Sequence, residues 1–147
     1  MIYMKQCTIM AVVNNSNIDY RGILDYYNNM SVVFRNSKIN LNITIRSIRT
    51  GIPLRAMDIM ASGGFLLSNY QEELAEYFID GEDMVLYYDD EDMMNKIEYY
   101  LAHDEERKRI AENGRRKVAD KYSYANAWRY IFSVCNLKKE HIDMSNR

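Results

Sequence analysis

The stretch GIPLRAMDIMASGGFLLSN, residues 51–69, decides the fold. Pro53 suits the first position of a helix, because the backbone N–H that proline lacks would have no partner there. The two glycines end that helix, and the apolar residues after them predict a short buried strand. Arg55 and Asp58 share one face of the helix, one turn apart, while Leu54, Met57 and Ala61 cover another.

The start of this helix has the features of an anion site. The amides of Leu54 and Arg55 lie at the positive end of the helix, where phosphate groups bind. Arg55 can hold a phosphate through a forked hydrogen bond, and Asp58 can accept from two neighbouring ribose hydroxyls. A surface ion pair, worth a few tenths of a kcal/mol, is the structural alternative. The preceding loop adds hydroxyls and positive charge to this helix start, from Thr44, Arg46, Ser47, Arg49 and Thr50. From the residues alone, both the nucleotide site and the structural alternative stay open.

Strands and helices alternate on either side of this stretch. Strands are predicted over residues 8–13, 39–45, 65–67 and 84–88. Helices are predicted over residues 26–36 and 71–78, and three further helices are predicted to begin near residues 89, 104 and 123. This order predicts an α/β, Rossmann-like fold: a mostly parallel sheet with helices on both faces and a helical C-terminal end. The ligand crevice of such a sheet lies beyond the C-terminal ends of its strands.

The C-terminal helices leave three local questions open. The acids from Asp89 to Asp92 suit a helix start, with a cation site as the alternative. The pair Asn113-Gly114 either ends a helix or weakens it. Ser123 is a candidate cap for the last helix, and Trp128 with its helical neighbours is expected to face the core.

Composition restricts the class of protein. A chain of 147 residues with a net charge of −2 fits one domain, here residues 1–136 followed by a polar tail over 137–147. No basic stripe favours nucleic acid, and two distant histidines offer no metal cluster. The apolar run over 9–13 is too short to cross a membrane, so a cytoplasmic location is expected. A receiver-type or flavodoxin-like domain is disfavoured, because the first predicted strand ends in NNSN without an acidic cluster.

Several segments resemble a known family. SKINLN (37–42), TGIPLRAMDIMASGGFLLSNYQEEL (50–74), F-x-x-G-E-D-M-V-L-Y (78–87) and YYLAHDEERKRIAENGRRKV (99–118) carry the resemblance. They resemble the C-terminal domain of GT-B glycosyltransferases, and most closely the spore maturation protein B-type (CgeB-like) family, with its pattern R-x-x-[DE]-x-x-A-x-G-G. The resemblance extends from about Gly22 to the final helix.

The resemblance implies a single half of a GT-B fold that binds a nucleotide-sugar donor. In the wider group, a Glu five residues before the first glycine holds the ribose, and that position here is Asp58. A second Glu, eight residues upstream, contacts the donor sugar, but Thr50 stands there and has no carboxylate. The retaining or inverting outcome therefore stays open. Arg55, Thr44 and Ser47 fall where such proteins bind the diphosphate.

The implied activity is transfer of a sugar, of the hexosyl type, from the donor to an acceptor nucleophile. No bound metal or other cofactor is expected, because helix-end amides and basic side chains would stabilise the leaving diphosphate. No catalytic residue is assigned. The candidate donor-binding residues are Arg55, Asp58, Thr44, Ser47, Gly51, Pro53, Leu54 and Asn69.

The acceptor domain of a complete GT-B enzyme has no counterpart in this length of sequence. We therefore expect a domain fragment, a truncated reading frame or one half of a split enzyme, without substantial turnover alone. An N-terminal half on another chain is one possible partner. In the resembled enzymes the last helix reaches toward that half, which implies that part of its aromatic face is exposed here. The alternative function is a non-catalytic binding or assembly module that retains the fold, as Thr50 would allow.

Overall fold

The structure is a computed structural model that describes residues 2–5, 9–14, 17–23, 25, 28–45 and 50–135, with side chains from residue 25 onward. The strands are β1 (Ile2–Lys5), β2 (Ile9–Asn14), β3 (Asn17–Ile23), β4 (Ile39–Asn42), β5 (Leu66–Asn69) and β6 (Val85–Tyr87). The helices are α1 (Met30–Asn36), α2 (Leu54–Ala61), α3 (Glu72–Tyr77), α4 (Asp90–Ala102), α5 (Asp104–Lys121) and α6 (Tyr124–Val134).

The central sheet is parallel throughout, with the strand order β1-β4-β5-β6. The predicted strand over 8–13 forms as β2, but it pairs antiparallel with β3 instead of joining this sheet. The reason is local: Asn14 pairs with Asn17, and so short a connection can join antiparallel strands but not parallel ones. The predicted turn NNSN is thus the connection of a hairpin.

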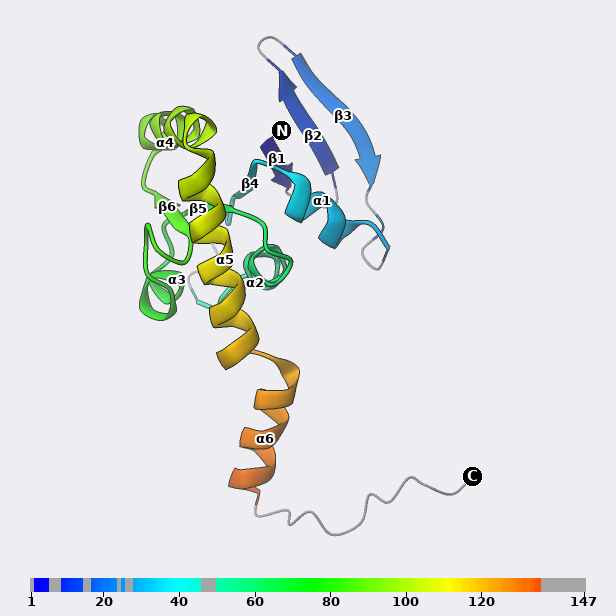
Figure 1. The fold of residues 1–147 in the computed structure, drawn as a ribbon, viewed down its shortest axis with the longest axis vertical. Helices are drawn as coiled ribbons and strands as arrows, with labels where there is room; N and C mark the ends of the chain where they lie inside the picture. The colour runs from blue at the N-terminus through cyan, green and yellow to red at the C-terminus, as the bar shows by residue number, and fades with distance from the viewer. Residues whose placement is uncertain are drawn as a thin grey trace.

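Helices cover both faces of the sheet, because its residues alternate between two apolar clusters. Leu66 and Leu86 pack with α1, α2, α3 and the end of α5. Leu67 and Val85, their neighbours in sequence, pack with α4 and the first half of α5. Helix α5 therefore crosses from one layer to the other, and the predicted Rossmann-like architecture is confirmed (Figure 1).

Strand β4 is shorter than its sequence pattern predicts, ending at Asn42 rather than near residue 45. The alternation of residues indicates one polar face, yet Asn40 and Asn42 are both buried. The Asn40 amide donates to the carbonyl oxygens of Phe34 and Phe65, at 3.0 and 3.1 Å. The Asn42 amide donates to the Ser68 hydroxyl at 3.0 Å. Hydrogen bonding of this kind is what permits polar groups inside the core.

Two helix predictions need correction. The helix expected over 26–36 starts at Met30, after a turn in which the Asn28 amide donates to the Asp25 carboxylate at 3.3 Å. Helix α5 runs through Asn113-Gly114 without ending there. A Cβ at Gly114 would overlap the Asp83 carbonyl oxygen, so the glycine permits close packing inside this helix.

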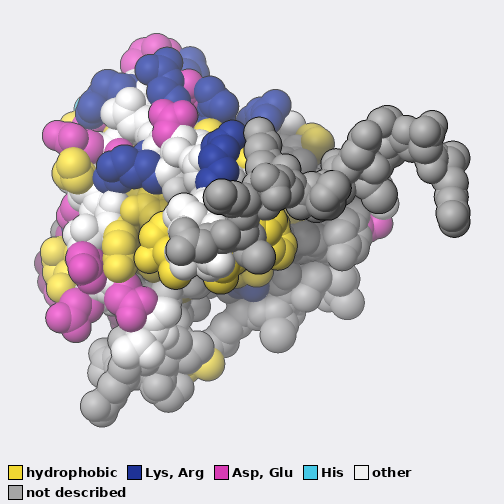
Figure 2. Space-filling view, turned by 90° about the horizontal axis from the view of Figure 1, so that it is seen from below, with side chains coloured by type: hydrophobic (Ala, Val, Ile, Leu, Met, Phe, Trp, Pro, Cys, Tyr) yellow, Lys and Arg dark blue, Asp and Glu magenta, His cyan; other side chains and the backbone are white. Residues whose placement is uncertain are grey.

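The last helix differs from its prediction more strongly. Its cap is confirmed, because the Ser123 hydroxyl accepts from the Asn126 amide. No residue of α6 is buried, however, and Trp128 is 55% exposed. The helix projects from the end of the molecule opposite the β2–β3 hairpin (Figure 1). Seen from that end, hydrophobic side chains gather on the surface (Figure 2). The proposed tail over 137–147 lies outside the described residues.

Candidate functional site

A cavity of about 460 Å³ lies beyond the C-terminal ends of β4, β5 and β6, where the fold predicts a ligand. We call it the tip cavity. Its lining comes from the segment after β4, from β5 and β6 and from the start of α4. The lining residues are Ile43, Thr44, Ile45, Asn69, Tyr70, Tyr87, Tyr88, Asp89 and Asp90. The volume falls within the range of small-molecule sites, roughly 300–1,000 Å³.

The structure brings together two of the predicted site residues, Thr44 and Asn69. The Thr44 amide donates to Asn69 Oδ1 at 2.8 Å, and Asn69 Nδ2 donates to the Thr44 carbonyl oxygen at 3.1 Å. Both ends of the Asn69 side chain are therefore engaged with the backbone. This pairing continues the contact between β4 and β5 past the last ladder residues and fixes one wall of the tip cavity.

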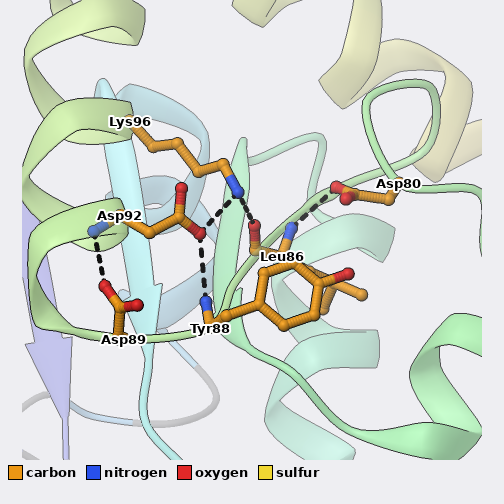
Figure 3. Close-up of polar contacts among 6 residues, drawn as sticks. All are labelled: Asp80, Leu86, Tyr88, Asp89, Asp92 and Lys96. Carbon is orange, nitrogen blue, oxygen red and sulfur yellow. Dashed lines mark hydrogen bonds and ion pairs between the residues drawn. The ribbon is translucent and has the colours of Figure 1, made fainter.

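Side chains also hold the outer edge of β6, the strand that ends at the tip cavity (Figure 3). Asp80 accepts from the Leu86 amide at 2.8 Å, and Asp92 accepts from the Tyr88 amide at 3.0 Å. The Lys96 ammonium donates to the Leu86 carbonyl oxygen at 2.6 Å and to Asp92 at 2.7 Å. These side chains occupy backbone groups that another strand would otherwise pair with, so the sheet ends at β6.

The acidic run at the start of α4 serves the helix. Asp89 is the N-cap of α4 and accepts from the Asp92 amide at 2.8 Å. The hydrogen bond from Lys96, the largest cause, lowers the pKa of Asp92, and the Tyr88 amide acts in the same direction. The helix-start interpretation is thus confirmed. Among the described residues, no group of three or more histidine, cysteine, aspartate or glutamate side chains could hold a metal ion.

Two tyrosines form an exposed stack in the tip cavity. The rings of Tyr70 and Tyr88 have centroids 5.3 Å apart and planes inclined by 23°. They keep 46% and 65% of their surface exposed. Next to them Tyr87 is buried; burial, followed by the charge of Asp90, raises the pKa of its phenol. Tyr70 directly follows β5, and only the fold reveals its stacking partner.

The approach to α2 combines a glycine turn with an acid from another helix. Gly51 has a φ of 97°, which favours glycine, and its amide donates to the Glu73 carboxylate. Pro53 is the N-cap of α2 rather than its first residue, and among the described residues no side chain caps the helix. Glu73 comes from α3, so sequence spacing gave no signal of this contact.

Arg55 and Asp58 both lie on α2 with partly buried side chains. Neither lines the tip cavity, and Ser47 lies outside the described residues. The buried face of α2 is formed by other residues, namely Ala56, Ile59 and Met60. Leu54 is 63% exposed, so it does not belong to a packed face. The predicted site thus divides into the tip cavity and the start of α2.

Comparison with known proteins assigns the chain to a family. Residues 4–133 match the family described as glycosyl transferase-like. The chain belongs to the glycosyl transferase-like family. No curated protein matches the sequence significantly.

Fifteen solved chains match this glycosyl transferase-like protein significantly. One is the C-terminal domain of a group 1 family glycosyl transferase (LpcC) from Francisella tularensis, with 23% identity and a TM-score of 0.57. The match covers 70% of our chain and 52% of that chain, so the chain spans about half the length of this solved relative. The predicted fold, that of a GT-B C-terminal domain, is confirmed.

Among the described residues, no helix is long and apolar enough to span a membrane.

Proposed function

We propose that this glycosyl transferase-like domain binds a nucleotide-sugar donor and supports transfer of its sugar, a hexose, to an acceptor. The observation that carries the proposal is the family match over residues 4–133. The fold supports it, because open parallel sheets bind ligands beyond the carboxyl ends of their strands. The nearer relation to the CgeB-like family, a cytoplasmic location and a domain spanning residues 1–136 are parts of the same proposal.

The nucleotide diphosphate would bind at the start of α2. The first helix-type hydrogen bonds of α2 come from the Ala56 and Met57 amides, which donate to the Pro53 carbonyl oxygen at 2.9 and 3.4 Å. The Leu54 and Arg55 amides precede these bonds, at the end of the helix that attracts anions, and the Arg55 guanidinium would add positive charge there. Asp58 would accept from the ribose hydroxyls, and at the Gly51 turn the phosphates would have to replace the Glu73 carboxylate that accepts from the Gly51 amide.

The leaving diphosphate would be stabilised by these groups without a metal ion. Positive charge and helix-end amides act where negative charge develops, which is the strongest general contribution of a protein to such a step. No acid or base in the described residues is assigned to the acceptor. That role belongs to a second, N-terminal half, on this or another chain.

The exposed face of α6 is a candidate contact with that half. Among the described residues, Trp128 and Phe132 stack on this helix with ring centroids 5.7 Å apart and remain about half exposed. Large apolar surface left open on a soluble domain marks an interaction site. We therefore expect turnover only when the two halves are together.

Isothermal titration calorimetry with UDP, GDP and their hexose conjugates tests the donor site. We expect Arg55→Ala to weaken binding at least tenfold, because a charge-assisted contact is worth about 1.5–3 kcal/mol. Asp58→Ala should weaken the binding of nucleotides that carry ribose more than the binding of nucleotides that carry deoxyribose. Arg35→Ala is the matched control: its guanidinium donates to the Ser62 carbonyl oxygen at the other end of α2. Unchanged affinity in both site variants would refute the assignment.

A second function is favoured by one observation, the exposed threonine at position 50. Without a carboxylate there, the domain could retain the fold as a non-catalytic binding or assembly module. A folded sample that binds a protein partner but no nucleotide or nucleotide sugar would establish this function instead.

A further inference from the structure

An acidic side chain occupies the turn where, under the proposed function, phosphate would bind. The Gly51 amide donates to the Glu73 carboxylate, and Glu73 lies on α3, 22 residues further along the chain. Gly51 closely precedes Pro53, the N-cap of α2. Backbone amides in a turn before a helix are donors that phosphate oxygens use. A carboxylate is the same kind of acceptor, so Glu73 holds a group that the diphosphate would also need.

The Gly51 turn has room for a ligand beside it. Gly51 is exposed, and its φ of 97° lies in the left-handed region that favours glycine. Apart from its chain neighbours, no atom of the described residues lies within 4 Å of the position that a Cβ at Gly51 would take. The backbone conformation, rather than close packing, therefore requires the glycine, and the described part of the chain leaves the turn open.

The Glu73 carboxylate has a second favourable position. Glu72 and Glu73 both lie in the first turn of α3, where the helix dipole favours negative charge. A glutamate side chain has several rotatable bonds, so its carboxylate can leave Gly51 while the backbone of α3 stays in place. It then remains beside the positive end of α3. The contact with Gly51 can thus break and form again within the folded domain.

The carboxylate and a diphosphate cannot share the Gly51 amide. Both are negative, and like charges at contact distance repel each other. A diphosphate that binds at this turn therefore has to break the hydrogen bond between Gly51 and Glu73, and the free energy of this step is subtracted from its affinity. A basic side chain next to the turn would not remove the competition, because it would also have to exchange the carboxylate for the phosphate.

We propose that Glu73 is an internal competitor for the phosphate of the donor and that it sets the affinity of the site. This role rests on the proposed function, which places the diphosphate at the start of α2. Without ligand, the carboxylate holds the Gly51 turn; in the complex, phosphate takes its place. A purely structural role of the same contact has the opposite consequence, because loss of Glu73 would then loosen the turn and weaken binding.

Isothermal titration calorimetry and amide NMR of the whole chain, with the variant Glu73→Gln, test this competition. Glutamine keeps a side-chain oxygen that can accept from Gly51 but removes the charge. Glu72→Gln is the matched control, because it makes the same change at the preceding residue of α3, which is exposed. The probes are inorganic pyrophosphate, UDP, UDP-glucose and uridine, which has no phosphate.

We expect pyrophosphate and UDP to bind about tenfold more tightly to Glu73→Gln than to the unaltered chain, since the hydrogen bond that they displace is no longer charge-assisted. Uridine should bind equally to both. Glu72→Gln should change the affinities by less than about twofold, because solvent screens an exposed charge. Without ligand, the Gly51 amide signal should move in Glu73→Gln and stay in place in Glu72→Gln.

Equal or weaker binding of pyrophosphate and UDP in Glu73→Gln would overturn the proposal, as would an equal gain in Glu72→Gln or no binding to either variant. Pyrophosphate that binds more tightly to Glu73→Gln and shifts the Gly51 signal, without any response to UDP-glucose, would support the competition and contradict the proposed donor. UDP-glucose binding that depends on Arg55 but not on Glu73 would contradict the competition alone.

Discussion

Helices α5 and α6 follow one another in the chain, and both have an apolar stripe, yet only α5 is packed. Ile110 and Val118 of α5 are buried against the sheet and its covering helices, whereas α6 has no buried residue. Polar contacts also fasten α5: the Lys117 ammonium pairs with Asp83, and the Asn113 amide donates to the Glu82 carbonyl oxygen. An apolar stripe therefore indicates that a helix needs a partner, but not which one.

The largest expected effect is a difference in stability loss between one substitution in α5 and one in α6. Ile110→Ala should lower the free energy of unfolding by about 2–5 kcal/mol, because it leaves a cavity in the core. Ile131→Ala in α6 should change it by less than about 0.5 kcal/mol, since this side chain is 43% exposed. Urea denaturation followed by circular dichroism measures both. Equal losses would mean that α6 is packed in solution.

The next effect concerns the close approach inside α5. Gly114→Ala should destabilise the fold by about 1–3 kcal/mol, although alanine favours helices, because the new methyl group would overlap the Asp83 carbonyl oxygen. Ala119→Ser, at an exposed position of the same helix, is the control and should be near neutral. A stabilised Gly114→Ala variant in the same denaturation experiment would show that α5 does not contact the 79–83 turn.

A smaller effect, on dye binding, tests whether the apolar side chains of α6 are exposed in solution. The double variant Trp128→Gln, Ile131→Gln should reduce the fluorescence of a dye that binds exposed hydrophobic surface, without lowering the unfolding midpoint. The reason is that both side chains contribute surface rather than core. Unchanged dye fluorescence together with a lower midpoint would place the stripe inside the fold.

The smallest effect is a pH dependence on the exposed side of α5. Hydrogen bonds from Arg115 and then Arg116 lower the pKa of Glu112 from 4.5 to about 2. A depressed carboxyl pKa stabilises the folded state above the unfolded pKa, and this contribution is lost as the pH falls from about 4.5 to about 2. Denaturation at several pH values should show a shallower acid loss in Glu112→Gln. An unchanged slope would contradict the pairing.

The sequence predicted what depends on neighbours in the chain. The cap at Ser123, the acidic start of α4 at Asp89 and the layered α/β order follow from local chemistry, and the structure confirms them. Local sequence patterns could not predict contacts between residues that are distant in the sequence. The contact between Glu73 and Gly51, and the stack of Tyr70 on Tyr88, exist only once the strand tips are assembled.

The assignment of Trp128 to the core was wrong for the same reason. Helical spacing places an apolar side chain on a face, but the rest of the described chain does not cover that face. The roles of Arg55 and Asp58 stay predictions. Their positions on α2 are fixed by the fold, and their function depends on a ligand.

The most direct test of donor binding is an amide NMR map of the chain titrated with a nucleotide sugar such as UDP-glucose. We expect the largest shifts at the amides from Gly51 to Asp58, around the start of α2. A map with its largest shifts on α6 or around the turn near Gly81, and none between Gly51 and Asp58, would contradict it.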